Sequence, residues 1–332
     1  MSKVLLSIIV PVYGVEKYIG KCLDALCSHL DKSTEVIIVD DGSPDSCPEI
    51  CDSYAERYGG VRVIHKENGG LASAVICGIE NSLGEYIGFC DGDDWVEDGF
   101  VYSVTEAIRV SSAEVIIFDY YRLTPGENGK NPQGSVGITP GYHDRRDCLE
   151  IRKRYMTPGG ISPCRWNKVY KRELVDLTLK YYSKRARIGE DIIFTAPIIY
   201  SMESLYYIDT PLINYNVNEG SMTATYNSSY LDNFYLVYDS LSRFFDNDTA
   251  FLGHIHYINM RTLVNSVYKS GIKNKAGYLK AVMSSPDFIS RISSVEGVRL
   301  EAADRIFFYF MKKRRPRPLL FGAFLYKIGN KL

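Results

Sequence analysis

The sequence predicts an α/β fold in which a mostly parallel sheet is flanked by helices and followed by a helical C-terminal region. Apolar runs of strand length alternate with segments of helical periodicity over residues 4–118, and the connections between them are short. That alternation is typical of βαβ units, whose crossovers are right-handed and whose strands pair in parallel. Beyond residue 228 the pattern is helical, with little strand signal.

The N-terminal third of the chain supplies most of the expected sheet. Val4–Val10 is an apolar run bounded by Pro11, as expected for a strand that is buried on both faces. Further strands are expected at Glu35–Val39, Val61–His65, Glu85–Cys90 and Glu114–Phe118. Apolar residues at helical spacing predict helices at Tyr18–Leu26, Cys47–Tyr58, Leu71–Leu83 and Phe100–Ser111.

The middle of the chain has a mixed pattern. Residues Leu123–Tyr142 are rich in Gly, Pro and Asn, which predicts a long loop. A helix is expected from Asp144, and Gly189-Glu190-Asp191 opens another helix over Ile192–Tyr200. Short strands are expected near residues 204–208 and 212–215.

Composition narrows the class of protein. The 332 residues are 45% hydrophobic and 24% charged, which describes a globular chain with a formal net charge of -1 and no basic excess for a nucleic-acid partner. The eight cysteines form no CxxC pair and no zinc spacing, so reduced thiols are expected. Neither a signal peptide nor an apolar run of membrane-spanning length is evident. The expected location is therefore cytoplasmic.

An acidic segment follows the Glu85–Cys90 strand. Asp91, Asp93 and Asp94 place three carboxylates within four positions, an arrangement that is costly unless a cation lies among them. Oxygen ligands on a loop suit Mg²⁺ or Mn²⁺, which keep waters and share substrate phosphates. The alternative is a polar turn that caps the next helix.

Polar segments follow several of the expected strands. In parallel sheets, ligands bind beyond the carboxyl ends of the strands. Four segments occupy such positions: Pro11-Val12-Tyr13, Asp40-Asp41, Lys66–Gly70 and Asp91–Asp94. We therefore expect one site at this edge of the sheet.

The end of the chain differs in charge. From Arg305 to Leu332 there are eight Lys and Arg residues and no acid, next to aromatic and aliphatic runs. Such a segment suits an interfacial helix on an anionic membrane surface. A terminal helix that packs on the body and exposes a solvated basic patch is the alternative.

Taken together, the segments resemble the inverting family-two glycosyltransferases of bacterial polysaccharide biosynthesis. Each segment alone is a weak signal, but their joint order and spacing are specific. The matching segments are Ser7–Tyr13, Glu35–Ser43, Asn68–Leu71, Gly84–Ile87, Asp91–Trp95, Trp166–Tyr170, Gly189–Asp191 and Ser221–Thr223.

The resemblance implies a glycosyltransferase A fold, a Mn²⁺ or Mg²⁺ ion and a nucleoside-diphosphate sugar donor, with a UDP-sugar expected. It implies that Asp93 holds the metal, that Asp191 is the general base, and that Glu190 lies beside it. Asp41 would accept a hydrogen bond from the uracil ring. The donor site would comprise Pro11, Tyr13, Asp41, Asn68, Gly70, Asp91 and Gly92. Trp166, Asn167 and Lys168 are assigned to the acceptor, although a buried structural tryptophan on a strand explains that segment equally well.

Two departures from the family pattern concern the donor site. Gly14 stands where the family usually has Asn, and Val75-Ile76 replaces the usual Arg-Asn pair. Lys66 or Arg62 could supply the missing polar contacts.

The expected function is a hexosyltransferase of the inverting, metal-dependent class, peripheral on the inner face of the cytoplasmic membrane. It would act in capsule, exopolysaccharide or lipopolysaccharide biosynthesis on a saccharide or polyprenyl-diphosphate-linked acceptor. The alternative is a catalytically silent scaffold subunit with the same fold. We expect a catalytic domain over 1–225, divided near 122 into nucleotide-binding and acceptor-side halves, and a helical region over 226–332.

Overall fold

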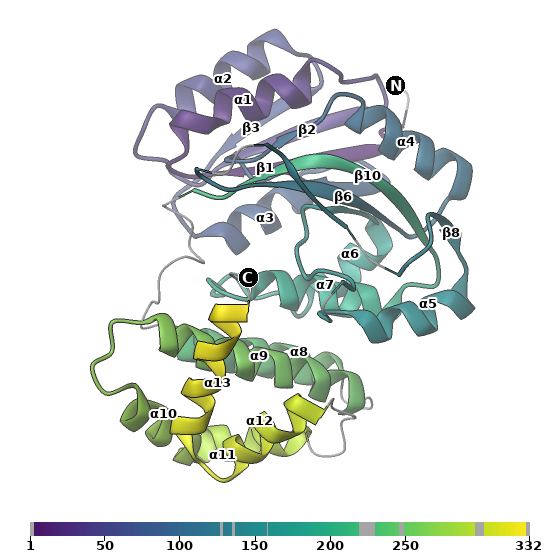
Figure 1. The fold of residues 1–332 in the computed structure, drawn as a ribbon. Coiled ribbons are helices and arrows are strands. Elements are labelled where there is room, and N and C mark those ends of the chain that lie inside the picture. Colours follow the sequence, from purple (N-terminus) through teal and green to yellow (C-terminus); the bar gives the residue numbers. More distant parts are fainter. Residues whose placement is uncertain are drawn as a thin grey trace. The chain divides into compact units, whose positions relative to one another are not determined.

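The computed structural model describes residues 3–126, 129–134, 137–157, 159–218, 230–245, 249–295 and 302–329. The chain forms two compact units, Met1–Glu219 and Gly220–Leu332. The first contains the sheet, and in the described part of the second all regular elements are helices (Figure 1). The Ser221–Thr223 segment of the family pattern lies outside the described residues.

The first unit is built on one sheet with the strand order β3-β2-β1-β4-β9-β6-β10-β5, to which β7 and β8 add at β6 and β10. The strands are β1 (Leu6–Val12), β2 (Thr34–Asp40), β3 (Val61–His65), β4 (Tyr86–Phe89), β5 (Trp95–Val96), β6 (Val115–Leu123), β7 (Asn131–Gln133), β8 (Gly141–His143), β9 (Lys168–Lys171) and β10 (Leu205–Asn216). Strands β1, β2, β3, β4, β6 and β10 share one direction, whereas β9 runs against its neighbours β4 and β6. The predicted α/β fold with a mostly parallel sheet is confirmed.

Helices cover both faces of the sheet. Figure 1 shows α1, α2 and α4 over one face and α3 and α6 over the other. All seven residues of β1 and all seven of β2 are buried, and most of them are apolar side chains that pack under these helices on both faces. The helices of this unit are α1 (Glu16–Cys27), α2 (Cys47–Arg57), α3 (Leu71–Glu80), α4 (Phe100–Ser111), α5 (Arg145–Ile151), α6 (Arg172–Leu179) and α7 (Glu190–Ser201), with a 3-10 turn at Arg152–Arg154.

The middle of the chain departs from the sequence prediction at two places. The two strands expected near 204–208 and 212–215 are one strand, β10, whose pairing with β6 shifts register on either side of Pro211. A proline has no N–H for the ladder, which explains the irregularity. The segment expected to be a loop contains β7 and β8.

The helix expected from Asp144 is present, and the Asp144 carboxylate caps it by accepting hydrogen bonds from Arg146 N and Asp147 N.

The second unit has a hydrophobic core of its own, to which Phe234, Leu241, Ile255, Met260, Phe288 and Leu319 contribute. Its helices are α8 (Tyr230–Phe244), α9 (Thr249–Lys269), α10 (Lys275–Ser284), α11 (Pro286–Ile292), α12 (Ala302–Lys312) and α13 (Pro316–Gly329), with a 3-10 turn at Ser293–Val295. Among the residues that the structure describes, no helix combines the length and apolarity needed to cross a membrane.

Candidate active site

The direction of the strands determines which segments meet at the site. Strands β1, β2 and β4 end at Val12, Asp40 and Phe89, so the polar segments after them lie at one edge of the sheet. Because β9 is antiparallel, its start reaches the same edge, and the residues before Lys168 arrive there as well. The site is thus assembled from the ends of parallel strands and the beginning of an antiparallel one.

Asp41 holds the glycine turn that precedes α3. Its carboxylate accepts hydrogen bonds from Gly69 N at 3.0 Å and Gly70 N at 2.6 Å, and from Lys66 Nζ at 2.5 Å. The Asp41 side chain is buried, and Asn68 is exposed in the same turn. Asp41 and the glycine turn are expected together at the donor site, and the structure joins them by hydrogen bonds.

The turn after β1 exposes an aromatic ring. Pro11 is buried, whereas the Tyr13 side chain is 53% exposed. Gly14 has a φ of 66°, in the left-handed region that glycine and asparagine both tolerate. This backbone requirement explains why Gly14 can occupy a position where the family usually has Asn.

The side chains at the Arg-Asn positions are part of the hydrophobic core. Val75 and Ile76 are buried in α3 and present no polar group to the site. Of the two expected substitutes, Lys66 contacts Asp41 at the site edge. Arg62 lies near the start of β3, where its guanidinium donates to Glu35 and to the carbonyl of Asn81. The expectation for Arg62 is wrong, because that contact fixes it at the other end of the sheet.

A second cation approaches the glycine turn from the loop before α7. The guanidinium of Arg187 lies against Gly70, where a β-carbon would collide with it. Gly70 also has a φ of 84°, so both the backbone and the packing require glycine there. Arg187 therefore connects the loop that carries Glu190 and Asp191 with the turn that Asp41 holds.

The acidic loop after β4 is packed closely against β1 and the end of β10. A β-carbon on Gly92 would lie 3.2 Å from the carbonyl oxygen of Pro11, so this approach favours glycine. Asp93 accepts from Asn218 Nδ2 at 2.7 Å, and the buried Asp94 accepts from Asn216 N at 2.8 Å. Asp91 and Asp93 remain half-buried at the site.

Arg165 joins the acidic loop to α7. Its side chain is 1% exposed. Nη2 donates to Asp91 Oδ1 at 3.0 Å, while Nη1 donates to Glu190 Oε1 at 2.9 Å and Asp191 Oδ1 at 2.5 Å. One buried guanidinium thus binds three carboxylates from two separate elements, which fixes their relative positions.

Burial and mutual repulsion raise the pKa values of the acids. Burial, and then the charge of Glu190, raise the pKa of Asp191 to about 7, although Arg165 opposes the shift. Burial raises the pKa of Asp91 to about 6, against the opposing effect of Arg165 and with a smaller contribution from Asp93. The pKa of Asp93 is also raised, mainly by burial. The single guanidinium does not balance the negative charge of this cluster.

The donor set fits a hard divalent cation. Mg²⁺ and Mn²⁺ are commonly held by one or two carboxylates together with substrate phosphates. Asp93 offers such a carboxylate, and no ion pair within the described parts of the chain involves it. Over the same parts, no three His, Cys, Asp or Glu side chains form a complete cage. The arrangement therefore suits an ion shared with a diphosphate.

The segment assigned to the acceptor is buried. Trp166 stacks on Tyr215 with ring centroids 5.2 Å apart, and its side chain is 5% exposed. The Lys168 ammonium donates to Asn167 Oδ1 and to the carbonyls of Ser162 and Cys164. This geometry favours the structural alternative for Trp166, Asn167 and Lys168, in which they support the start of β9.

Sequence reasoning missed Arg165 and Asn218. Arg165 directly precedes the recognised Trp166–Tyr170 segment, but a lone arginine there gives no sign of which acids it binds. Its partners are distant in sequence and meet it only because β9 is inserted antiparallel between β4 and β6.

Asn218 belongs to a run of alternating asparagines after Leu212. This alternation is a sequence signal for one polar face of a strand.

Known proteins resemble this chain in sequence and fold. Residues 7–177 match the model of glycosyl transferase family 2. The uncharacterized glycosyltransferase EpsJ of Bacillus subtilis is 32% identical over 224 residues, which are 66% of this chain and 63% of EpsJ. Glycosyltransferase GlyA of Streptococcus pneumoniae is 27% identical over 68% of this chain, and the match spans 32% of GlyA.

Among solved structures, Staphylococcus aureus TarS 1–349 in complex with UDP-GlcNAc superimposes with a TM-score of 0.72 at 19% identity. The alignment covers 98% of this chain and 92% of TarS 1–349. This likeness supports the fold. The family match extends over more than half of the sequence and includes the glycine turn, the acidic loop and Arg165. The chain belongs to glycosyl transferase family 2.

Proposed function

We propose that this chain transfers a sugar, with inversion and with the help of a divalent cation, from a UDP-sugar to a hydroxyl of a saccharide acceptor. The observation that carries the proposal is the arrangement around Arg165. One buried guanidinium holds Asp91, of the acidic loop, together with Glu190 and Asp191, at the start of α7. These ion pairs support a site in which the proposed base lies close to the proposed donor-binding loop.

Several contacts support a nucleotide at the edge formed by β1 and β2. The exposed Tyr13 ring is available to stack on a base. Asp41 accepts hydrogen bonds from the glycine turn and from the Lys66 ammonium, so a cation lies beside the proposed nucleotide site. TarS, the structural neighbour, has been solved with UDP-GlcNAc and with UDP. These points favour a uridine nucleotide as the donor.

Asp191 is the proposed general base. A new bond forms between the acceptor oxygen and the anomeric carbon, the bond from that carbon to the diphosphate oxygen breaks, and the acceptor proton passes to a carboxylate oxygen of Asp191. Attack opposite the leaving diphosphate inverts the anomeric centre. The pKa of Asp191, raised to about 7 by burial and by Glu190, suits a base that accepts a proton near neutral pH.

Asp93 is the residue that would hold the divalent cation. When bound, such an ion neutralises the charge that develops on the leaving diphosphate. Arg165 has a different role, since it contacts Asp91 and Asp191 rather than Asp93. Arg165 orients both carboxylates and lowers their pKa values, which keeps Asp191 available as a base.

A calorimetric titration of UDP into the full chain, in Mn²⁺ and then in EDTA, tests the donor site. We expect binding that is tighter with Mn²⁺ than with EDTA, followed by transfer to saccharide or polyprenyl-diphosphate-linked acceptors in a screen of UDP-sugars. If UDP, GDP and dTDP all fail to bind, the chain is better explained as a silent scaffold subunit with a glycosyltransferase fold.

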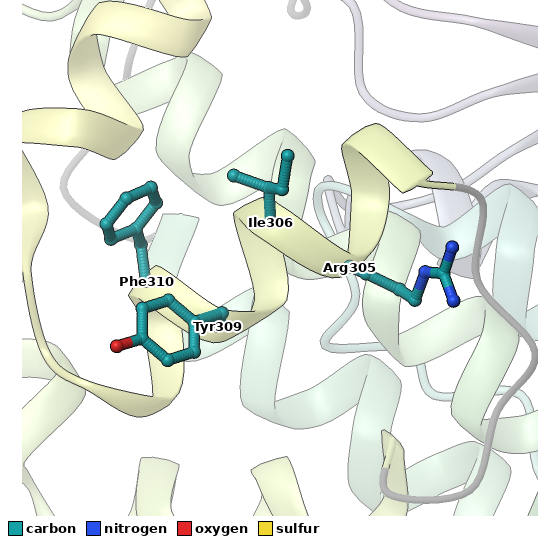
Figure 2. A pocket seen from close by; sticks show the side chains of 4 residues that line it. All are labelled: Arg305, Ile306, Tyr309 and Phe310. Atoms are coloured by element: carbon teal, nitrogen blue, oxygen red, sulfur yellow. The ribbon is translucent and has the colours of Figure 1, made fainter.

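The C-terminal helices offer a surface for an anionic membrane, which we propose as the place where a polyprenyl-linked acceptor is met. Figure 2 shows the Ile306, Tyr309 and Phe310 side chains around a shallow hollow on α12, with Arg305 beside them. Ile306 is 60% exposed and Tyr309 52%. Lys312, Lys313, Arg314 and Arg315 follow directly and are exposed. Exposed apolar and basic groups together suit a bilayer interface.

Vesicle sedimentation at low salt tests the membrane surface. The full chain should bind vesicles containing phosphatidylglycerol more strongly than pure phosphatidylcholine vesicles, and added salt should weaken binding by screening. Replacing Ile306 and Tyr309 with serine should reduce binding, whereas Tyr102→Ser, at a similarly exposed ring on α4, should not. If the wild-type chain does not sediment with anionic vesicles, the proposed membrane surface is wrong.

We also propose that the two units have different functions. Residues 1–225 would form the catalytic domain, with the nucleotide-binding half over about 1–122 and the acceptor-side half over 123–225. Residues 226–332 would form the membrane-associating region. The division of the chain near Glu219 and the position of every proposed donor residue before Leu123 support this arrangement.

A further inference from the structure

Three alternating asparagines, two on β10 and one just beyond its end, donate hydrogen bonds to the acidic loop. Asn214 Nδ2 donates to Trp95 O at 3.2 Å and Asn216 Nδ2 to Asp93 O at 3.3 Å. Asn218 Nδ2 donates to Asp93 Oδ2 at 2.7 Å. Asn214 and Asn216 lie two apart on β10 and point to the same face, and Asn218, two residues beyond the end of the strand, adds a third amide that contacts the loop.

The backbone that follows the acidic loop pairs with the same strand, β10. Trp95 pairs with Asn214 across the antiparallel β5–β10 ladder, and Asn216 N donates to the buried carboxylate of Asp94. The loop is therefore fixed at both its backbone and its side chains. Asn218 differs from the other two asparagines because its side chain contacts the carboxylate of Asp93.

We propose that Asn218 is a positioning residue that orients the Asp93 carboxylate for the divalent cation of the donor complex. This inference rests on the proposed function. A neutral amide can donate to the carboxylate without cancelling its charge, whereas a lysine or arginine at this position would compete with the metal. No ion pair among the residues that the structure describes involves Asp93 or Asp94.

The charge arrangement supports a separation of roles within the loop. Arg165 contacts Asp91, the first acid, whereas Asp93 is contacted by Asn218. The Arg165 guanidinium thus partly neutralises Asp91. The charge of Asp93 stays available for a divalent cation that binds and leaves. Because partners of metal ligands are typically worth 10–100-fold in metal affinity, loss of the Asn218 amide should weaken the metal-bound complex measurably.

The experiment uses the full chain and the Asn218→Ala and Asn218→Leu variants, the second of which keeps a similar side-chain volume. UDP is titrated in Mn²⁺ and in EDTA, and free Mn²⁺ is measured by electron paramagnetic resonance in the presence of UDP. We expect Mn²⁺-dependent UDP affinity to fall about tenfold or more in both variants, with UDP affinity in EDTA unchanged. Asn81→Ala, which removes an exposed amide at the end of α3, is the matched control and should match wild type.

The outcomes separate the two proposals. Wild-type chain that binds no UDP overturns the proposed function and this inference with it. Wild-type chain that binds UDP with Mn²⁺, together with Asn218 variants of equal affinity, overturns the role of Asn218 alone. An equal loss of UDP affinity in Mn²⁺ and EDTA also overturns it, because that pattern belongs to a residue that merely supports the loop.

Discussion

The charge of Arg165 and the burial around it act in opposite directions on the same carboxylates. Burial raises the pKa values of Asp91 and Asp191, whereas the guanidinium lowers them. The balance leaves Asp191 with a pKa of about 7. Burial and Glu190 therefore raise the pKa of the proposed base, and the Arg165 guanidinium, which hydrogen-bonds to Asp191, Glu190 and Asp91, limits the rise.

The pH dependence of transfer follows from that pKa. The Asp191 carboxyl must be ionised to accept a proton, and its pKa lies well above the ordinary value of 3.8. We expect kcat/KM to rise with pH up to about 7 and then to level off. A profile that stays flat from pH 5.5 to 8 would assign the base to another group.

Asp191→Asn should abolish transfer while UDP affinity in Mn²⁺ stays close to wild type, because the amide cannot take a proton but has nearly the same shape. The folded protein at pH 7 should become more stable, since the pKa of the acid is raised on folding and ionisation therefore disfavours the native state above the ordinary pKa. Single-turnover assays and urea unfolding measure the two effects. Transfer at the wild-type rate would remove Asp191 from the mechanism.

Arg165→Met should leave three buried or half-buried carboxylates without their cation. Removing one partner of a buried ion pair typically costs about 3–5 kcal/mol, so a marked loss of stability is expected in urea unfolding. The pKa of Asp191 should rise further, which moves the acidic limb of kcat/KM to higher pH. Arg165→Lys keeps the charge and should shift that limb less. A lysine variant with the methionine profile would contradict the electrostatic role.

At the scale of elements, α3 packs closely on the sheet through Gly78. A β-carbon at this position would collide with Ile9 of β1 and would lie 3.3 Å from Val39 of β2. The missing side chain allows the helix to approach β1 and β2, whose ends lead into the turns of the proposed donor site. The position of α3 therefore depends on a residue far from the chemistry.

Gly78→Ala should destabilise the protein by about 1–3 kcal/mol, because overpacking a close helix–sheet contact forces a backbone shift. Urea unfolding measures the loss. The matched control is Gly20→Ala on α1, where a β-carbon meets no atom within 4 Å and helix propensity favours alanine. Equal stability of Gly78→Ala and wild type would mean that α3 can move without cost.

Most elements of the first unit could be predicted from the sequence because their signals are local. Val61–His65 and Phe100–Ser111 begin and end where the sequence predicts them. Strand β5 has only two residues and exists through its pairing with β10, so no periodicity could reveal it. Strand β10 was expected as two pieces because Pro211 interrupts its pattern, yet the pairing with β6 resumes beyond it.

The candidate site could be predicted where its residues follow strands. Asp41, Asp91 and Asp93 lie at the edge that the βαβ pattern predicts. Arg165 and Asn218 could not be assigned, because their roles depend on which distant segments the sheet order brings together. The sequence could not decide between an acceptor role and a structural role for Trp166, Asn167 and Lys168, since residue type alone does not report burial; all three are buried, which favours the structural role.

On the scale of the whole molecule, the two compact units differ in what they contain. The proposed donor and base residues lie in Met1–Glu219, and the exposed apolar and basic groups of α12 lie in Gly220–Leu332. A fragment covering residues 1–229 should fold and bind UDP in Mn²⁺ with the affinity of the full chain, but should not bind anionic vesicles. Titration and sedimentation measure both properties. A fragment that folds but binds UDP much more weakly would assign part of the donor site to the second unit.

The antiparallel insertion of β9 also has a consequence for synthesis. Strand β4 acquires its second neighbour only when β9 arrives, and roughly 80 residues separate the two, which is about 4–16 s of translation at about 5–20 residues per second. During that interval the nascent sheet exposes an open edge, the feature through which unfinished chains pair with one another. Slower growth at lower temperature or a chaperone on the emerging chain should therefore raise the soluble yield. The strand whose start positions Arg165 is also the one that covers the open edge of β4 and joins it to β6.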